Sequence, residues 1–202
     1  MKIKFHIFFC LMLILLLSAC AKPATKYHPV SDDTPRQSTL GFSITPPPGA
    51  AWFERHNQES LYYLKKTRPK LYSISTRATE IHVDRAFHQK SDFHNYVKSR
   101  KALAQSPTRY KNIEFQFSDI DNLSPYCVRY TNKYDDHGEQ SSKGKSYVRV
   151  KKTGIFCMHP ESPQNGIDMF YQERSLSSSQ EPSFQKEGEQ FLSSLQFQSI
   201  VN

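Results

Sequence analysis

The segments "YCVRYTNKY" (residues 126–134) and "SYVRVKKTGIFCMH" (residues 146–159) lie on either side of the polar stretch "DDHGEQSSKGK" (residues 135–145). Tyr, Val and Thr alternating with polar residues are typical of strands, and a polar stretch that contains glycine is typical of a turn. We therefore predict an antiparallel hairpin whose turn centres on Ser142. This hairpin is the starting point for the rest of the fold.

In such a hairpin Cys127 lies directly opposite Cys157. Directly opposed residues of antiparallel strands can approach to about 4.5 Å between Cα atoms, which a disulfide can bridge. We predict that bond, and closing a loop of about 30 residues contributes on the order of 3–4 kcal/mol in the chain-entropy model. The alternative is a redox or nucleophilic cysteine, for which the sequence offers neither a CxxC motif nor an obvious base.

The first twenty residues have the character of a targeting segment. Lys2 and Lys4 precede the almost unbroken apolar run of residues 5–17. A bilayer-spanning helix needs about 20 apolar residues, so this run is too short to span and instead fits a signal-peptide core of roughly 7–15 residues. We predict that residues 1–19 are removed. Export to an oxidising compartment agrees with the predicted disulfide.

The end of this segment, Leu17-Ser18-Ala19-Cys20, resembles the lipobox of bacterial lipoproteins. The resemblance implies that the chain is cut before Cys20, whose thiol then carries diacylglycerol and whose new amine carries a fatty acid such as palmitate. In two-membrane bacteria Asp after this cysteine retains a lipoprotein in the inner membrane, and this chain has Ala21 there. The resemblance therefore implies the outer membrane, facing the periplasm. The alternative is an ordinary signal peptide with a chance cysteine.

Residues 20–39 are polar and contain three prolines, so we predict a flexible tether there. Residues 40–202 are predicted to form a single globular domain. Within it, Ser91 and Asp92 suit a helix start, and Pro107 suits its end. Apolar residues at helical spacing predict a second helix over 182–197.

Between and before these helices the chain has several consecutive strand-like segments with short polar connections, which favour an antiparallel sheet. We predict the α+β class: a sheet of about six strands packed by two or more helices as an α/β/α sandwich. The element order, with a Pro- and Trp-ended strand in residues 41–52 and a closing helix over 185–197, resembles PsbP-like domains. That resemblance implies a protein-binding or assembly module, and no functional residue is transferred from it.

The chain carries a formal net charge of +8, and part of the excess gathers near the hairpin. This basic patch consists of Lys143, Lys145, Arg149, Lys151 and Lys152. It has two interpretations: a solvated strand face with lysines that guard a sheet edge, or a contact for anionic lipid head groups or another acidic envelope polymer. Nucleic acid is not an expected partner, since no recognition motif is present.

A second polar cluster combines imidazoles and carboxylates, the ligands that zinc prefers. It consists of His82, Asp84, His88, Asp92 and His94. The spacing matches no established zinc motif, and the residues are expected to fall on a strand end, a connection and a first helical turn. Exposed connection residues are the competing interpretation, and we predict neither a metal nor another cofactor.

Together these features predict a membrane-anchored envelope lipoprotein that acts as a non-catalytic binding or assembly module. Its expected partners are the membrane, through the lipid on Cys20, and an envelope protein. The alternative is a metal-dependent periplasmic hydrolase that uses the His82–His94 region.

Overall fold

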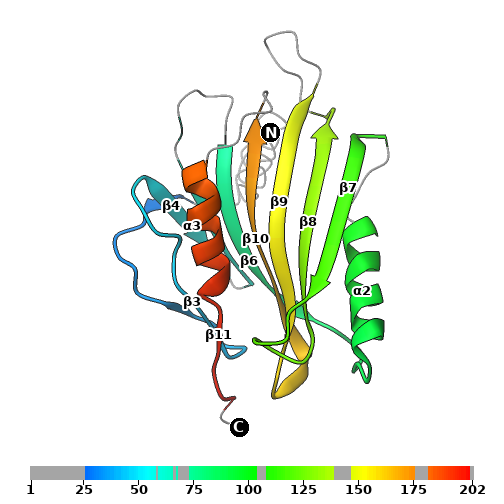
Figure 1. The fold of residues 1–202 in the computed structure, drawn as a ribbon. Coiled ribbons are helices and arrows are strands. Elements are labelled where there is room, and N and C mark those ends of the chain that lie inside the picture. The colour runs from blue at the N-terminus through cyan, green and yellow to red at the C-terminus, as the bar shows by residue number, and fades with distance from the viewer. Residues whose placement is uncertain are drawn as a thin grey trace, which may run out of the picture.

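A computed structural model describes residues 26–57, 59–65, 67, 73–103, 108–138, 147–175 and 182–200. Within these residues an 8-stranded antiparallel sheet has the strand order β1-β4-β5-β6-β10-β9-β8-β7, and a 3-stranded sheet has the order β11-β3-β2 (Figure 1). The strands are β1 His28–Pro29, β2 Arg36–Gln37, β3 Phe42–Ile44, β4 Trp52–His56, β5 Ser60–Lys65, β6 Ser73–His82, β7 Tyr110–Asp119, β8 Cys127–Asp136, β9 Val148–His159, β10 Ser162–Ser175 and β11 Gln196–Phe197. The helices are α2 Lys90–Leu103 and α3 Pro182–Ser193.

The predicted hairpin forms two neighbouring strands of the large sheet, β8 and β9, between β10 and the edge strand β7. Cys127 pairs with Cys157 in its register, as the predicted alignment of the two strands requires. The Cα atoms of these cysteines are 4.0 Å apart and their sulfurs are at disulfide distance. The predicted Cys127–Cys157 pair is confirmed.

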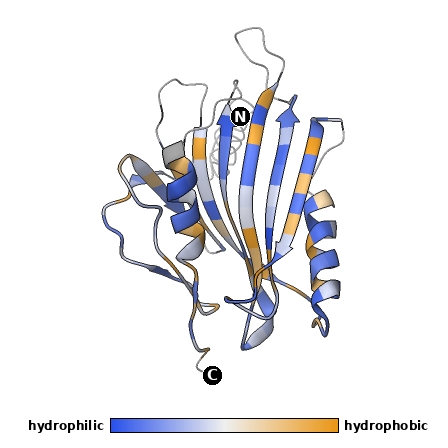
Figure 2. Ribbon diagram, viewed as in Figure 1, coloured by the Kyte–Doolittle hydropathy of each residue, from blue (hydrophilic) through white to orange (hydrophobic). Residues whose placement is uncertain are grey.

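The large sheet has two different faces, because successive side chains of a strand point to opposite sides. Figure 2 shows this as alternating hydrophobic and hydrophilic bands along the strands. On one face, Ile155 and Met169 belong to the same buried cluster as Phe184 and Phe191 of α3. We call this the α3-bearing face. The opposite face carries the alternate residues of the same strands.

Two features hold α3 close to the sheet. Gly188 of α3 packs directly on a tyrosine of β10: a Cβ at Gly188 would lie 2.4 Å from the Cγ of Tyr171. Glycine weakens a helix by about 1 kcal/mol relative to alanine, and here the loss permits the close approach. Trp52 is the second feature, because its indole N–H donates to the Pro48 carbonyl at 3.0 Å and to Glu187 of α3 at 3.1 Å.

The opposite face packs against α2 through a smaller cluster. Phe93 and Val97 of α2 are buried together with Val128 and Phe156 of the sheet. Gly154, in the middle of β9, leaves room beside them: a Cβ there would lie 2.6 Å from the phenol ring of Tyr130. This gap lets the Tyr130 ring lie across the sheet surface.

The predicted fold class is wrong. We expected an α+β sandwich with about six strands, whereas the protein is β-rich, with 52% strand and 16% helix. The main sheet has 8 strands. One reason is strand length, since β9 and β10 run for 12 and 14 residues. The other is that α2 and α3, of 14 and 12 residues, add little helix to so large a sheet.

The predicted tether also contributes to the fold. Of residues 20–39, His28–Pro29 pair with β4 as the edge strand of the large sheet, and Arg36–Gln37 pair with β3. Arg36 donates two hydrogen bonds to Glu54, at 3.0 and 3.2 Å. The second half of the tether is therefore attached to the domain. Among the described residues, no helix is both long enough and apolar enough to cross a bilayer.

Candidate functional site

A line of alternating cationic and aromatic side chains crosses the face opposite α3. The register places Arg55 of β4 beside Tyr62 of β5, Tyr62 beside Arg77 of β6, and Arg77 beside Phe170 of β10. Directly opposed side chains on one face of a sheet lie close enough to interact. We call these four residues the cation–aromatic row. Four strands that are separate in the sequence build it.

Tyr27, just before β1, extends the row at the sheet edge. The guanidinium carbon of Arg55 lies 5.1 Å from the centre of the Tyr27 ring and 5.5 Å from that of Tyr62. The two tyrosine rings are 6.0 Å apart in an edge-on arrangement. A cation within about 6 Å of an aromatic face is attracted by the ring quadrupole. Arg55 is therefore held between two rings at the surface.

Lysines approach the other end of the row. The Lys152 ammonium lies 4.4 Å from the centre of the Phe170 ring, and the Lys101 ammonium of α2 lies 3.9 Å from that of Tyr130. Lys101 donates to Asp168 at 2.6 Å, and the Tyr130 hydroxyl donates to the same carboxylate at 2.7 Å. Asp168 is thus already engaged by two donors.

The two arginines of the row, and Lys152 beside its Phe170, lack such partners. In the described part of the chain, none of Arg55, Arg77 and Lys152 has a carboxylate within 4.0 Å. Burial, followed by the positive charge of Lys101, lowers the pKa of Lys152 from 10.5 to about 8. Like charges are therefore crowded on this face, an arrangement that favours an anionic ligand.

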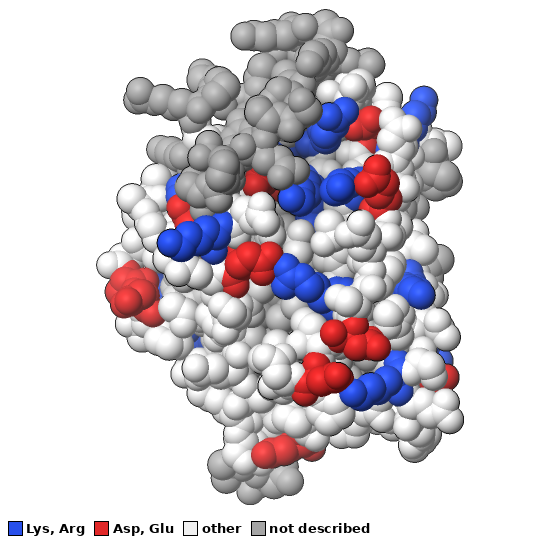
Figure 3. Space-filling view, in the orientation of Figure 1, with Lys and Arg blue, Asp and Glu red and all other residues white. Residues whose placement is uncertain are grey.

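The α3-bearing face has the opposite character. Several of its cations are paired: Lys65 donates to Glu187 at 2.5 Å, Arg129 pairs with Glu189, and Lys133 lies 3.4 Å from Glu114. Lys and Arg side chains stand beside Asp and Glu side chains across this side of the molecule (Figure 3). This face has no comparable excess of positive charge.

The predicted basic patch is divided between the two faces. Lys143 and Lys145 lie outside the described residues. Arg149 and Lys151 project from the α3-bearing face, where Arg149 reaches Asp135 at 3.5 Å. Lys152, one residue further on, projects from the opposite face and joins the row. The three described residues of the patch therefore do not form one continuous surface.

The predicted imidazole–carboxylate cluster is spread along a connection. His82, at the end of β6, is 3.3 Å from the side-chain oxygen of Asn165, and His94 in α2 is 2.8 Å from Asp119. Asp84, His88 and Asp92 are exposed between and beside them. Across the residues that the structure describes, no three His, Cys, Asp or Glu side chains gather in a way that could hold a metal ion.

Of the cysteines, Cys20 lies outside the described residues. Cys127 and Cys157 are buried on the α3-bearing face, where Cys157 is the cross-strand partner of Ile167. Their position in the core assigns this pair to stability rather than to surface redox chemistry.

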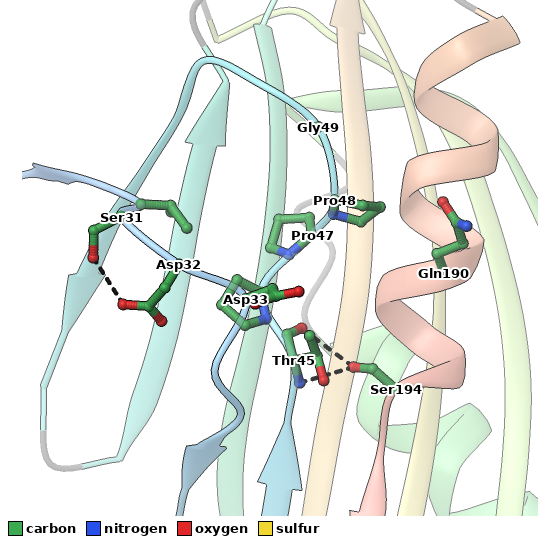
Figure 4. Close-up of a pocket in the computed structure, with 11 residues that line it drawn as sticks. Ser31, Asp32, Asp33, Thr45, Pro47, Pro48, Gly49, Gln190 and Ser194 are labelled. Atoms are coloured by element: carbon green, nitrogen blue, oxygen red, sulfur yellow. Dashed lines mark hydrogen bonds between the residues drawn. The ribbon is translucent and has the colours of Figure 1, made fainter.

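A cleft of about 450 Å³ lies beside α3, between the proline segment and the start of the described chain (Figure 4). Ser194 of the loop after α3 closes its floor by donating to the Thr45 carbonyl at 3.2 Å. On its rim, Asp32 is bound by Arg36 at 2.9 Å. The cleft follows from the rigid turn of Pro46–Pro48, and we assign no ligand to it.

Sequence reasoning missed the cation–aromatic row, because register alone brings its members together. The one available signal was Arg55 on one side and Tyr62 on the other side of a short polar stretch in "FERHNQESLYYL", residues 53–64. Known proteins offer no further guide: no family model matches the sequence, and neither a curated protein nor a solved structure matches it. The resemblances to bacterial lipoproteins and to PsbP-like domains stay predictions.

Proposed function

We propose that this chain is a bacterial envelope lipoprotein, anchored by lipid on Cys20, whose domain is a non-catalytic binding or assembly module. The observation that carries the proposal is the lipobox-like Leu17–Cys20 after an apolar run too short to span a membrane. The disulfide-distance pair Cys127–Cys157 supports it, because such bonds persist in exported proteins and are rare in the cytosol.

The anchoring follows from ordinary membrane energetics. Each buried CH₂ group contributes about 0.8 kcal/mol, so one acyl chain holds a protein only marginally, while two or three hold it stably. Ala21 in place of Asp favours the outer membrane, on its periplasmic side. The domain would then remain within reach of other envelope proteins.

For a protein partner, we propose the part of the α3-bearing face formed by β7, β8 and β9. Helix α3 packs on β10 and β6, so it leaves the neighbouring strands to the surface. Gln116, Lys133 and Arg149 are exposed there. Mixed charges of this kind are typical of the polar rim of a transient interface.

The anchor is tested by Cys20→Ala, with Cys10→Ala as the matched control. We expect Cys20→Ala to abolish incorporation of labelled palmitate and to accumulate the uncleaved precursor. Cys10→Ala should change neither, since that cysteine leaves with the signal peptide. Normal labelling and membrane fractionation of Cys20→Ala would refute the proposal.

The binding surface is tested by photo-crosslinking in intact cells. A crosslinker at Gln116 should give a discrete protein adduct that Lys133→Glu weakens. A crosslinker at the exposed Asn95 of α2 is the control and should not give that adduct. Identical adducts at both positions, or none at Gln116, would contradict the assignment of this face.

A further inference from the structure

The geometry points to a second surface: we propose that the cation–aromatic row lies against the anionic head groups of the membrane that carries the anchor. This inference rests on the proposed lipidation of Cys20 and adds the orientation of the domain and the chemistry of its contact. It assigns the lipid surface to the face opposite α3 and leaves the α3-bearing face toward the periplasm.

The length of chain between the anchor and the sheet limits their separation. Tyr27 is seven residues after Cys20, and a fully extended chain spans at most about 3.3–3.6 Å per residue, or roughly 24 Å in all. Next along the chain, His28 and Pro29 are already paired with β4. The edge of the sheet that carries Tyr27 is therefore confined close to the membrane surface.

Tyr27, the residue before β1, lies on the same face as the row. Tyr27 contacts Arg55 and Tyr62, both on the face opposite α3, with its ring 6.0 Å from that of Tyr62. The residue that precedes β1 thus lies on the side of the row. A domain held through so few residues can bring this face to the membrane surface.

Charge distinguishes the two faces. Arg55, Arg77 and Lys152 have no carboxylate partner within 4.0 Å among the described residues. On the α3-bearing face, carboxylates such as Glu114, Glu187 and Glu189 accompany the cations. An anionic leaflet attracts clustered Lys and Arg side chains, and it is repelled by carboxylates.

The side-chain types of the row suit a membrane–water interface. Tyrosine is enriched at membrane–water interfaces, where its ring meets the acyl boundary and its hydroxyl remains hydrated. Arginine carries an apolar stem and can keep its guanidinium at the phosphate level. Tyr27 is 40% exposed, which makes it one of the two most exposed large apolar side chains among the described residues. Ile113, the other, lies on β7 at the far edge of the sheet.

This difference in position provides the test. The mature protein, isolated from membranes and placed in vesicles, is oxidised by hydroxyl radicals, and the rates at Tyr27, Tyr62 and Ile113 are measured by mass spectrometry. Ile113 is the internal reference, because its exposure of 37% matches the 40% of Tyr27. One set of vesicles contains phosphatidylcholine alone, and the other also contains phosphatidylglycerol.

We expect phosphatidylglycerol to slow oxidation of Tyr27 and Tyr62 but not of Ile113, and salt to reverse the protection. Arg55→Gln with Arg77→Gln should weaken docking roughly 25-fold, because each cation near an anionic surface contributes about a factor of five. Lys133→Gln with Lys186→Gln removes the same charge from residues outside the row and should leave the protection intact.

Equal oxidation of the two tyrosines in both kinds of vesicle would overturn the orientation, as would protection that survives loss of both arginines. The mass of the mature N-terminus separates these results from failure of the anchor. A lipidated Cys20 without protection refutes only the docking face. A mature protein without lipid refutes the anchor and the docking face together.

Discussion

The two faces of the main sheet use the same strands for different purposes. On the α3-bearing face, Met169 is fully buried under the helix, while the next residue, Phe170, lies half-buried in the cation–aromatic row. The first face joins apolar side chains to paired charges, as Lys65 and Glu187 illustrate. The second carries Arg55, Arg77 and Lys152, which have no carboxylate within 4.0 Å among the described residues, beside pairs such as Lys101 and Asp168. The contrast indicates that the first face stabilises the domain and the second is available for a ligand.

The largest effect on stability is expected on the α3-bearing face. Phe191 of α3 is 0% exposed, and its ring lies 5.8 Å from that of Tyr63. Phe191→Ala should lower the free energy of unfolding by about 3–5 kcal/mol, because it removes a buried ring and leaves a cavity. Urea denaturation of the purified protein measures this. Tyr62→Ala, on the other face, should cost about 1 kcal/mol or less. Equal losses would break the comparison.

The disulfide belongs to the same stabilising face. Replacing both Cys127 and Cys157 by Ala should lower the free energy of unfolding by about 3–4 kcal/mol, since the unfolded chain then loses a constraint across a sequence separation of 30 residues. Urea denaturation is again the measurement, and reduction of the unaltered protein should give a similar loss. If neither the substitution nor reduction lowers the free energy of unfolding, this pair does not stabilise the domain.

The crowded cations of the opposite face should make the free energy of unfolding depend on pH. The pKa of Lys152 is lowered to about 8 by burial and by the Lys101 charge, with Arg174 and Arg77 adding to it and Asp168 opposing it. Between this value and the unfolded value of 10.5 the unfolded chain binds more protons, so stability rises with pH across that range. A full shift corresponds to about 3 kcal/mol.

Lys152→Met should remove most of this rise, and urea denaturation at several pH values checks it. Lys101, whose pKa is also lowered by burial, accounts for the remainder. A stability that stays flat or falls as the pH increases above 8 would show that Lys152 is not held among uncompensated positive charges.

The smallest effect is expected for the exposed part of the row. Arg77 is exposed and has no carboxylate within 4.0 Å among the described residues, so Arg77→Gln should change the free energy of unfolding by less than about 0.5 kcal/mol. Thermal or urea unfolding measures it. A loss several times larger would assign this arginine to stability and remove the distinction between the faces.

The sequence allowed the local features to be predicted. The alternation around Cys127 and Cys157 identified the hairpin and its register, and helical spacing with Pro107 identified a helix that the structure places at Lys90–Leu103. These features depend on neighbouring residues. The number of strands was wrong because segments such as His28–Pro29 pair through tertiary contacts and carry no pattern of their own.

The candidate site could not be predicted from the sequence for the same reason. Arg55 and Phe170 belong to one row although more than a hundred residues separate them, and only the pairing of β4, β5, β6 and β10 brings them together. The described residues of the basic patch are divided between the two faces for a simpler reason. Lys151 and Lys152 are adjacent in sequence, so in a strand they project to opposite faces.

The mass of the mature protein, taken from the membranes of a bacterial host that processes it, reports on the anchor and the disulfide together. We expect a chain that begins at Cys20 with diacylglycerol on its thiol and that carries no free thiol at Cys127 or Cys157. A chain that begins elsewhere without lipid would contradict the anchor, and two free thiols in the folded domain would contradict its assignment to an oxidising compartment.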